Sequence, residues 1–474
     1  MHYAKVDAAI VRAIRTIVAD PERVLTRQQD LASYSYDASF GAYFPEIVVQ
    51  PLITSEVAGI VRLAYEASIP VYPRGKSTSL SGGPLPVEGG IVLDLSKMNQ
   101  VLDIVPDDLI AIVSPGVVTG DIHRAAEKYG LMYPPDPSSL SICTIGGNLS
   151  ENAGGPRGLK YGVTKDYVLG LEVVTPKGEV IRTGGRTVKN VTGYDLTKLI
   201  GGSEGTLGII TQAVLQLIPK PPACGTLLAV FDDVVTAGTA ISQILVSGLL
   251  PAKLEIMDQA CIQAVEAYEP CGLPADAAAV LLVEVDGHPL AVKEELKQAA
   301  SVFRSMGAKQ VVIAGSEAES AVLWKARKMV SPAITRIKPT KISEDATVPR
   351  SKIPEMFARL KEIGDKYKIN LVVFGHAGDG NLHPNILADK RDRDEMQRVE
   401  LAIAEIFETA VALGGTLSGE HGIGMMKAPF MEMELGKAGL DMMKAVKEAW
   451  DPKDIMNPGK IFPRPDQKLV LIER

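Results

Sequence analysis

Two stretches rich in glycine, serine and small polar residues constrain the first half of the chain. The first is 73–83, and the second, 144–155, lies inside a longer irregular stretch, 134–162. Long irregular stretches inside a compact domain are uncommon and usually bind something. Small residues let backbone N–H groups approach an anion closely, so the pair of loops predicts a large phosphate-bearing ligand. Taken singly, such clusters are more often ordinary turns.

Two common nucleotide-binding motifs are absent from the sequence. There is no G-x-G-x-x-G at a strand–helix junction and no G-x-x-x-x-G-K-[ST]. NAD on a Rossmann fold and ATP on a P-loop are therefore disfavoured. The formal net charge of -7 also provides no global positive field for nucleic acid.

Length, cysteine usage and hydropathy indicate a globular protein of a reducing compartment. The 474 residues suggest about two or three domains. The 4 cysteines include no pair at the two-residue spacing of a zinc or iron–sulfur clamp, and we interpret them as buried or incidental thiols. No leader and no apolar run long enough to span a bilayer is evident. We expect a soluble cytoplasmic protein, an expectation compatible with membrane association through a partner.

The sequence Pro-Lys-Pro-Pro at 219–222 ends the alternating apolar run that closes the stretch 201–216, and it predicts a domain boundary. An amphipathic helix is expected over 6–20, before the first glycine-rich loop. After the boundary, strands alternate with long helices, which predicts an α+β sheet covered by helices on one side. The strands are expected at 227–231, 280–285, 310–313 and 371–374, and the helices at 292–305, 352–367 and 395–413.

Residues 372–383 predict a β-hairpin that carries two histidines. Asp379-Gly380 is a strong two-residue turn signal, and with these as central residues His376 lies directly opposite His383. Cross-strand partners have Cβ atoms roughly 4.5–5.5 Å apart on one face, which suits two imidazoles on one metal ion. A lone histidine is usually structural or exposed, and we interpret three others in this way: His2, His123 and His288.

A third candidate metal ligand lies in 414–424, where two glycines end the preceding helix. The chain then turns extended, so Glu420 and His421 point to opposite sides. Assigning Glu420 to the metal gives two histidines and one carboxylate. His421 is left as a base, because an unperturbed imidazole titrates near neutral pH. Taken alone, this pair is equally compatible with a structural role.

The order of these motifs resembles a known group of flavoproteins. The two loops, the segment 134–139 and GGSEGTLGII at 201–210 resemble the FAD-binding domain of the vanillyl-alcohol oxidase and p-cresol methylhydroxylase superfamily. Within it, the D-lactate dehydrogenase and glycolate oxidase FAD-subunit family is the nearest match, and the later motifs extend the resemblance to nearly the whole chain. The resemblance implies an α+β fold, with a two-lobed FAD-binding domain of the p-cresol methylhydroxylase type and an α+β substrate (cap) domain.

The implied domain boundaries follow the break at 219–222. We expect an N-terminal helical segment over 1–40 and an FAD-binding domain over 41–220. The substrate domain is expected over 221–474, with the metal site in it and a C-terminal segment that returns to the flavin.

The resemblance also implies a set of FAD contacts. The first loop would hold the pyrophosphate, and Glu204 with Ile209 would meet the adenosine half. Some relatives attach FAD covalently through a histidine in the first loop, but Thr78 stands at that place here, so we predict non-covalent FAD. Lys76-Ser77 replaces smaller residues and adds a charge near the phosphates. The predicted cofactor-binding residues are Arg74, Gly75, Lys76, Ser77, Thr78, Ser79, Asp136, Ser139, Gly147, Ser150, Asn152, Ala153, Gly154, Glu204, Ile209 and Asn457.

By the same resemblance, His376, His383 and Glu420 bind one divalent metal ion (Zn, Mn or Fe), and His421 is the base. Arg327 lies in a basic helical cluster that has no specific meaning by itself. The resemblance assigns it to the substrate carboxylate, which a planar guanidinium can bind through two hydrogen bonds. The expected activity is FAD- and metal-dependent oxidation of a small D-2-hydroxy acid, with D-lactate first and glycolate next.

Electrons must then leave the flavin. No iron–sulfur, haem or NAD site is evident in the sequence, so a separate acceptor is expected, and the resemblance suggests an electron-transferring flavoprotein or an iron–sulfur subunit. Three alternatives stay open on the sequence: an oxygen-using flavin oxidase, a non-catalytic flavin electron-carrier subunit, and a metal hydrolase without flavin.

Overall fold

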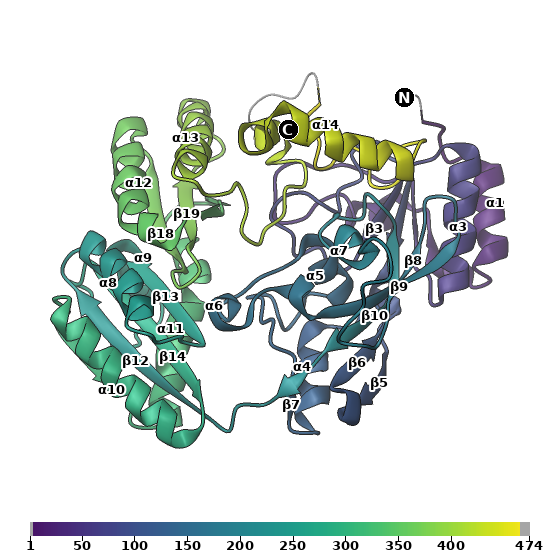
Figure 1. Ribbon diagram of the computed structural model, residues 1–474. Coiled ribbons are helices and arrows are strands. Elements are labelled where there is room, and N and C mark those ends of the chain that lie inside the picture. Colours follow the sequence, from purple (N-terminus) through teal and green to yellow (C-terminus); the bar gives the residue numbers. More distant parts are fainter. Residues whose placement is uncertain (1–2, 465–474) are drawn as a thin grey trace. The chain divides into compact units, whose positions relative to one another are not determined.

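The structure is a computed structural model that describes residues 3–464, and the chain divides into two compact units (Figure 1). The first unit comprises Met1–Ala153, Val163–Lys220 and Glu420–Arg474, and the second comprises Gly154–Gly162 and Pro221–Gly419. Our sequence-based division also fell at residue 220, but it left 420–474 with the second half. In the structure, the described part of that stretch, residues 420–464, packs with the first unit.

The first unit is built on two larger sheets with strand orders β1-β2-β4-β3 and β5-β6-β10-β8-β9, and β7 pairs with β11. Its strands are β1 (Val24–Leu25), β2 (Ile47–Val49), β3 (Val71–Arg74), β4 (Ile91–Asp94), β5 (Val101–Val105), β6 (Ile110–Val113), β7 (Leu131–Met132), β8 (Val168–Val174), β9 (Val180–Gly184), β10 (Ile209–Gln216) and β11 (Ile218–Pro219). Its α-helices are α1 (Ala8–Ile17), α2 (Gln28–Ala32), α3 (Thr54–Ala67), α4 (Thr119–Glu127), α5 (Ile145–Glu151), α7 (Leu196–Ile200) and α14 (Met431–Trp450).

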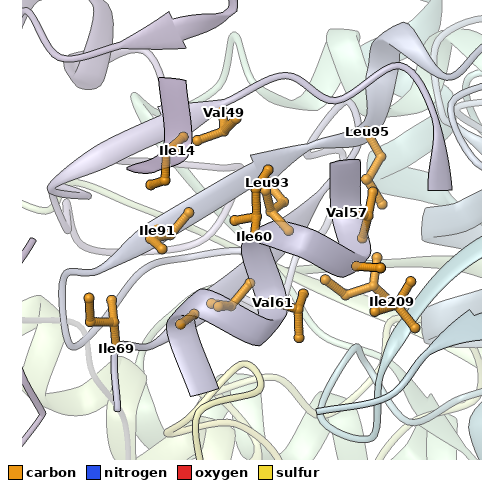
Figure 2. Close-up of a cluster of buried hydrophobic side chains, with 14 of the residues drawn as sticks. Ile14, Val49, Val57, Ile60, Val61, Ile69, Ile91, Leu93, Leu95 and Ile209 are labelled. Atoms are coloured by element: carbon orange, nitrogen blue, oxygen red, sulfur yellow. The ribbon is translucent and has the colours of Figure 1, made fainter. Parts of the chain in front are cut away.

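Helix α3 forms because apolar side chains recur on one of its faces. Val57, Ile60, Val61 and Ala64 follow the spacing i, i+3, i+4, i+7, and all are buried. They join side chains of the parallel strands β2, β3 and β4 in one core, which Figure 2 shows. The helix expected over 6–20 is observed as α1, which packs on this core through Ile14.

The C-terminal segment extends the first sheet beside β3. The Val71 N–H donates to the Ile455 carbonyl, and the Asn457 N–H donates to the Val71 carbonyl. Because β3 leads directly into the first glycine-rich loop, this pairing places Asn457 at the start of that loop. The returning C-terminal segment is therefore fixed by backbone hydrogen bonds.

The stretch 134–162 contains regular structure that the sequence did not indicate. We expected no regular element there, but α5 and α6 (Gly158–Tyr161) both lie in it. Helix α5 forms despite two glycines because Ile145 and Leu149 are buried in the core. Tertiary burial here outweighs the low helix propensity of glycine.

The second unit is built on a sheet of order β15-β12-β14-β13-β18-β19-β16, with β17 also paired to β19. Its strands are β12 (Ala223–Phe231), β13 (Lys253–Asp258), β14 (Ala279–Gly287), β15 (Gln310–Ile313), β16 (Thr340–Ser343), β17 (Ala346–Thr347), β18 (Asn370–His376) and β19 (Asn381–Ala388). With α6, its α-helices are α8 (Val234–Val246), α9 (Gln259–Tyr268), α10 (Pro289–Ser305), α11 (Glu317–Ile334), α12 (Ile353–Tyr367) and α13 (Arg393–Ala412). None of the helices within 3–464 is both long and apolar enough to cross a lipid bilayer.

Helices cover both faces of this sheet, so the predicted one-sided arrangement is wrong. Val230 of β12 packs with side chains of α9 and α11 in one core cluster. The next residue, Phe231, points to the opposite face, where its ring centroid lies 6.3 Å from that of Phe303 in α10. The uninterrupted burial of β14 from Ala279 to Asp286 is typical of a strand covered on both sides.

Strands β18 and β19 form the predicted hairpin in a different register. His376 pairs with Asn381, and Phe374 pairs with His383, so the prediction that the two histidines are direct cross-strand partners is wrong. The chain makes a longer turn because the Gly380 carbonyl accepts the Val348 N–H, which docks the turn on a neighbouring segment. The register differs from the expected one by two residues, an even number, so both imidazoles still lie on the same face as diagonal neighbours.

We predict that Gly380→Ala destabilises the second unit by about 2 kcal/mol or more, because backbone strain and a clash add together. Gly380 has φ +90°, and a Cβ there would lie 2.1 Å from the Val348 carbonyl oxygen. Gly248→Ala is the matched control: φ is +89°, and apart from its two chain neighbours no described residue comes within 4 Å of its Cβ position. Urea unfolding should show a clearly larger loss for Gly380→Ala, and equal losses would contradict the role of this contact.

Candidate active site

A cavity in the first unit lies where β3, both glycine-rich loops and the C-terminal segment meet. It contains about 790 Å³ of empty space that opens to solvent, a size suited to a large organic ligand. The predicted cofactor-binding residues that line it are Arg74, Gly75, Lys76, Ser77, Thr78, Ser79, Gly147, Ser150, Glu204, Ile209 and Asn457.

The other residues predicted to contact the cofactor do not line this cavity; they are Asp136, Ser139, Asn152, Ala153 and Gly154. Asn152 ends α5 in the left-handed conformation, and its side chain accepts the Lys165 N–H. The Ala153 carbonyl accepts both the N–H and the hydroxyl of Thr164. Asn152 and Ala153 therefore shape the second loop, and their contact with a cofactor stays a prediction.

Two glycines in the cavity lining allow the chain segments around the cavity to pack closely. A Cβ on Gly75 would lie 2.1 Å from the Thr144 hydroxyl oxygen, and one on Gly146 would lie 2.8 Å from the Pro115 Cβ. The first loop can therefore touch Thr144 only because Gly75 has no side chain, and Gly146 in the same way lets α5 approach Pro115. Sequence analysis overlooked Gly146 and Thr144, although both belong to the second loop.

Polar atoms in the cavity fit a polar ligand such as FAD. The Ser77 hydroxyl and the Asn457 side-chain carbonyl oxygen are buried and have no hydrogen-bond partner in the described part of the chain. The Asn457 amide nitrogen donates to the carbonyls of Gly83 and Glu204, at 3.0 and 2.6 Å, which fixes the direction of this side chain. Buried polar atoms are normally paired, so these two positions favour an added hydrogen-bonding partner.

Arg74 lines the cavity, but its guanidinium group supports the protein backbone. It donates to the carbonyls of Tyr34 and Tyr36, at 3.3 and 3.1 Å. Burial lowers the pKa of this guanidinium from its ordinary value. Contact between Arg74 and a phosphate would therefore involve its backbone more readily than its charged group.

Glu204 anchors the segment that follows Glu420 and His421. Its carboxylate accepts the N–H groups of Ile423 and Gly424, both at 2.7 Å. The Ser81 hydroxyl donates to the His421 carbonyl at 3.0 Å. Both carboxylate oxygens therefore hold this segment in place, and contact between Glu204 and the adenosine half of FAD stays a prediction.

Glu151, which sequence analysis did not select, is a second carboxyl group of the cavity lining. Burial, followed by the negative charge of Glu204, raises the pKa of Glu151 to about 8. A single acidic residue inside a loop of small neutral residues is the sequence signal that could have identified it. The group is therefore protonated in the folded protein at neutral pH.

We predict that the stabilising contribution of Glu151 is present below its ordinary pKa and is lost as pH rises towards about 8. The sign follows because the folded state keeps a proton that the unfolded state releases. Between about pH 5 and 8, the thermal midpoint of the wild type should therefore fall relative to that of Glu151→Gln. Glu179→Gln, an exposed turn substitution in the same unit, is the control and should follow the wild type. Parallel curves for all three proteins would contradict the prediction.

The two histidines of the hairpin lie together in the second unit. His376 and His383 are both buried, and their ring centroids are 5.0 Å apart. Each offers a ring nitrogen, and the two nitrogens lie within 4.8 Å of each other. This arrangement brings together two of the predicted metal ligands.

Glu255 of β13, which sequence analysis did not select, lies beside His376. Strand β13 pairs with β18 so that Ile256 faces Gly375, and the same register places Glu255 opposite His376. The His376 Nδ1 lies 2.7 Å from the Glu255 Oε1. A carboxylate that accepts one ring N–H fixes the tautomer in which the other nitrogen can bind a metal. The available signal was a glutamate within the apolar run Leu254-Glu255-Ile256-Met257.

Arg327 of α11 also binds Glu255. Its Nε and Nη2 lie 2.8 and 2.7 Å from the Glu255 Oε2, and its guanidinium lies over the Phe374 ring at 4.6 Å from the centroid. Burial would raise the pKa of Glu255, but its interactions with His376 and Arg327 outweigh burial and hold that pKa below its ordinary value. One edge of the Arg327 guanidinium is therefore occupied by the protein itself.

Asp345 fixes the end of the second unit that precedes Glu420. It is fully buried, and its Oδ2 accepts the Ser418 hydroxyl at 2.7 Å and the Gly419 N–H at 2.9 Å. Glu420 follows Gly419 and begins the last segment of the first unit. In that unit, the Glu420 Oε1 lies 3.9 Å from the His421 Nε2.

Two asparagines beside the histidines also present polar atoms that fit an ion or a polar ligand. Asn381 is the cross-strand partner of His376, and the Asn385 amide donates to the His383 carbonyl. Both side-chain carbonyl oxygens are buried and lack a hydrogen-bond partner among residues 3–464. Imidazole nitrogens with nearby oxygen donors are a chemically suitable set for a divalent transition metal.

Solved structures share this fold over nearly the whole chain. p-Cresol methylhydroxylase with substrate bound superposes with a TM-score of 0.78 at 20% identity, covering 97% of each chain. 4-Ethylphenol oxidase from Gulosibacter chungangensis gives a TM-score of 0.78 at 19% identity, covering 98% of this chain and 99% of the other. The fold is therefore that of p-cresol methylhydroxylase, as the sequence predicted.

Family models and curated relatives then define the protein more closely. A model described as an FAD binding domain matches residues 45–184, and one for FAD linked oxidases, C-terminal domain, matches residues 220–461. Glycolate oxidase subunit GlcD of Bacillus subtilis (strain 168) is 49% identical, covering 96% of this chain and 97% of its own. D-lactate dehydrogenase of Anaerostipes hadrus is 35% identical, with 97% and 98% covered. The chain belongs to the FAD-linked oxidase family, and it is a flavoprotein oxidoreductase that uses FAD.

Proposed function

We propose that the protein oxidises a small D-2-hydroxy acid, D-lactate or glycolate, to the 2-oxo acid, with the help of FAD and one divalent metal ion. The observation that carries the proposal is the buried pair His376–His383, with Glu255 on the first imidazole and Arg327 on Glu255. The names of the relatives, glycolate oxidase subunit and D-lactate dehydrogenase, support this substrate class.

In this proposal His376, His383 and Glu420 hold the metal ion. FAD would supply the two-electron acceptor, and the metal would supply a Lewis acid that lowers the pKa of the substrate hydroxyl. The Gly419 N–H, which directly precedes Glu420 in the chain, is bound by Asp345.

The remaining groups act on the substrate and on the flavin. His421 would take the proton of the substrate hydroxyl, and Arg327 would orient the substrate carboxylate. Because the Nε and Nη2 edge of Arg327 faces Glu255, the carboxylate would approach from the side of Nη1. In the first unit, Ser77, Thr78 and Asn457 would hold FAD in the cavity.

We propose that the electrons leave to a separate protein, such as an electron-transferring flavoprotein or an iron–sulfur subunit. The 4 cysteines, Cys143, Cys224, Cys261 and Cys271, provide no iron–sulfur spacing. The name of the Bacillus subtilis relative describes that protein as a subunit, which supports a multi-protein assembly for this chain as well.

Anaerobic bleaching of the bound flavin tests the proposal. We predict that D-lactate or glycolate reduces the flavin absorbance, and that chelation or His376→Ala or His383→Ala slows reduction by 100-fold or more, roughly the effect expected when a metal and its ligands are lost. Flavin content should stay unchanged, because these histidines belong to the second unit and the cavity to the first. His288→Ala, at an exposed position, is the control.

Other outcomes distinguish the alternatives. Full activity of metal-free enzyme would contradict the role of the metal. Peroxide formation in air at the rate of turnover would identify an oxidase, and a flavin that no hydroxy acid reduces would indicate an electron carrier. A colourless purified protein would contradict the proposal as a whole.

We predict that acid precipitation releases the flavin into the supernatant. Thr78 has no ring nitrogen with which to form a covalent bond to the flavin, and it lines the cavity. The absorbance of the supernatant should account for all of the flavin present before precipitation. A yellow pellet that keeps its colour after washing would show covalent attachment through another residue.

A further inference from the structure

We propose that Glu255 is a positioning residue that couples metal binding to recognition of the substrate carboxylate. The inference rests on the proposed function, since it assumes that His376 binds the metal and that Arg327 meets the substrate. It goes further by assigning to one buried side chain the relative placement of these two groups.

The sheet places Glu255 where it can reach both groups. The side chain has 0% exposure and projects from the middle of β13 towards the same layer as His376. A lone buried carboxylate would be strongly destabilising, so its retention among apolar neighbours requires specific partners. Its partners are the imidazole of the adjacent strand and the guanidinium of the covering helix.

The two carboxylate oxygens of Glu255 bind different residues. Oε1 lies 2.7 Å from the His376 Nδ1, whereas Oε2 receives the Nε and Nη2 groups of Arg327 at 2.8 and 2.7 Å. A carboxylate can accept hydrogen bonds at both oxygens at once. A glutamine cannot, because its NH₂ group would face either donors of Arg327 or the N–H of His376. In the second case, His376 would change tautomer and put its proton on Nε2.

The two partners of this carboxylate are also linked to each other through aromatic ring contacts. The Arg327 guanidinium lies over Phe374, the Phe374 ring lies 5.5 Å from that of His383, and His383 lies 5.0 Å from His376. The side chains therefore form a ring of contacts, in which Glu255 joins His376 to Arg327. Movement of the histidines on losing this carboxylate would consequently be accompanied by movement of the guanidinium.

The experiment compares metal affinity and substrate binding in Glu255→Gln holoenzyme. Affinity for Zn²⁺ is measured by competition with a chromophoric chelator, and Co²⁺ alone is used as a spectroscopic probe of the ligand geometry. We expect Zn²⁺ affinity to fall by about 10- to 100-fold, the usual effect of removing a carboxylate behind a metal-binding histidine. The Co²⁺ spectrum should change, and the KM for the hydroxy acid should rise in the same variant while the flavin content stays constant.

Glu284→Gln is the matched control. Glu284 is a buried carboxylate on the neighbouring strand β14, and it pairs with Lys253 at 2.9 Å. Its loss removes a buried ion pair from the same sheet without touching the histidines. Glu255→Asp is the second variant, because it keeps the buried charge but is too short to reach both partners. It should show the same two effects even if the glutamine variant folds poorly.

The outcomes separate this inference from the proposed function. Wild-type protein that binds Zn²⁺ together with unchanged affinity and KM in both Glu255 variants would overturn the inference alone. A change in metal affinity without any change in KM would overturn the coupling. Wild-type protein that binds neither Zn²⁺ nor Co²⁺ would overturn the metal part of the proposed function and this inference with it.

Discussion

The chemistry proposed for the second unit depends on the register of three adjacent strands. Strand β13 places Glu255 opposite His376, and β18 and β19 pair so that His383 is a diagonal neighbour on the same face. A slip of one residue at either pairing would turn one of these side chains to the opposite face, against other helices. The backbone hydrogen bonds of the sheet therefore determine whether the polar groups meet at all.

In the first unit, a residue without a side chain brings two loops together. Gly75 allows the first loop to contact Thr144, and the cavity forms around this close approach. Glu204 then ties the segment after His421 to the rim through two backbone N–H groups. Residues far apart in the sequence are held at one cavity by hydrogen bonds to main-chain groups.

Carboxyl groups in the two units are kept in different protonation states by their surroundings. In the second unit, interactions with His376 and Arg327 hold the pKa of Glu255 below its ordinary value, so this carboxylate stays ionised. In the first unit, Glu151 lies near another carboxylate, and its pKa of about 8 keeps it protonated at neutral pH. An ionised carboxylate can orient two donors, whereas a protonated one can itself donate a hydrogen bond. The surroundings thus allow Glu255 to accept hydrogen bonds from two donors and Glu151 to donate one.

The sequence by itself determined the class of fold, the two glycine-rich loops and the histidine hairpin, because glycine patterns, Asp379-Gly380 and apolar periodicity act over short distances along the chain. It did not determine the register of the hairpin, which depends on a hydrogen bond from Val348, nor the helices on both faces of the sheet. The acidic residue in the apolar run around Glu255 is a local signal of a buried carboxylate, but it does not say which groups that carboxylate binds. Its partners, His376 and Arg327, are 121 and 72 residues away, and only tertiary packing brings them to it.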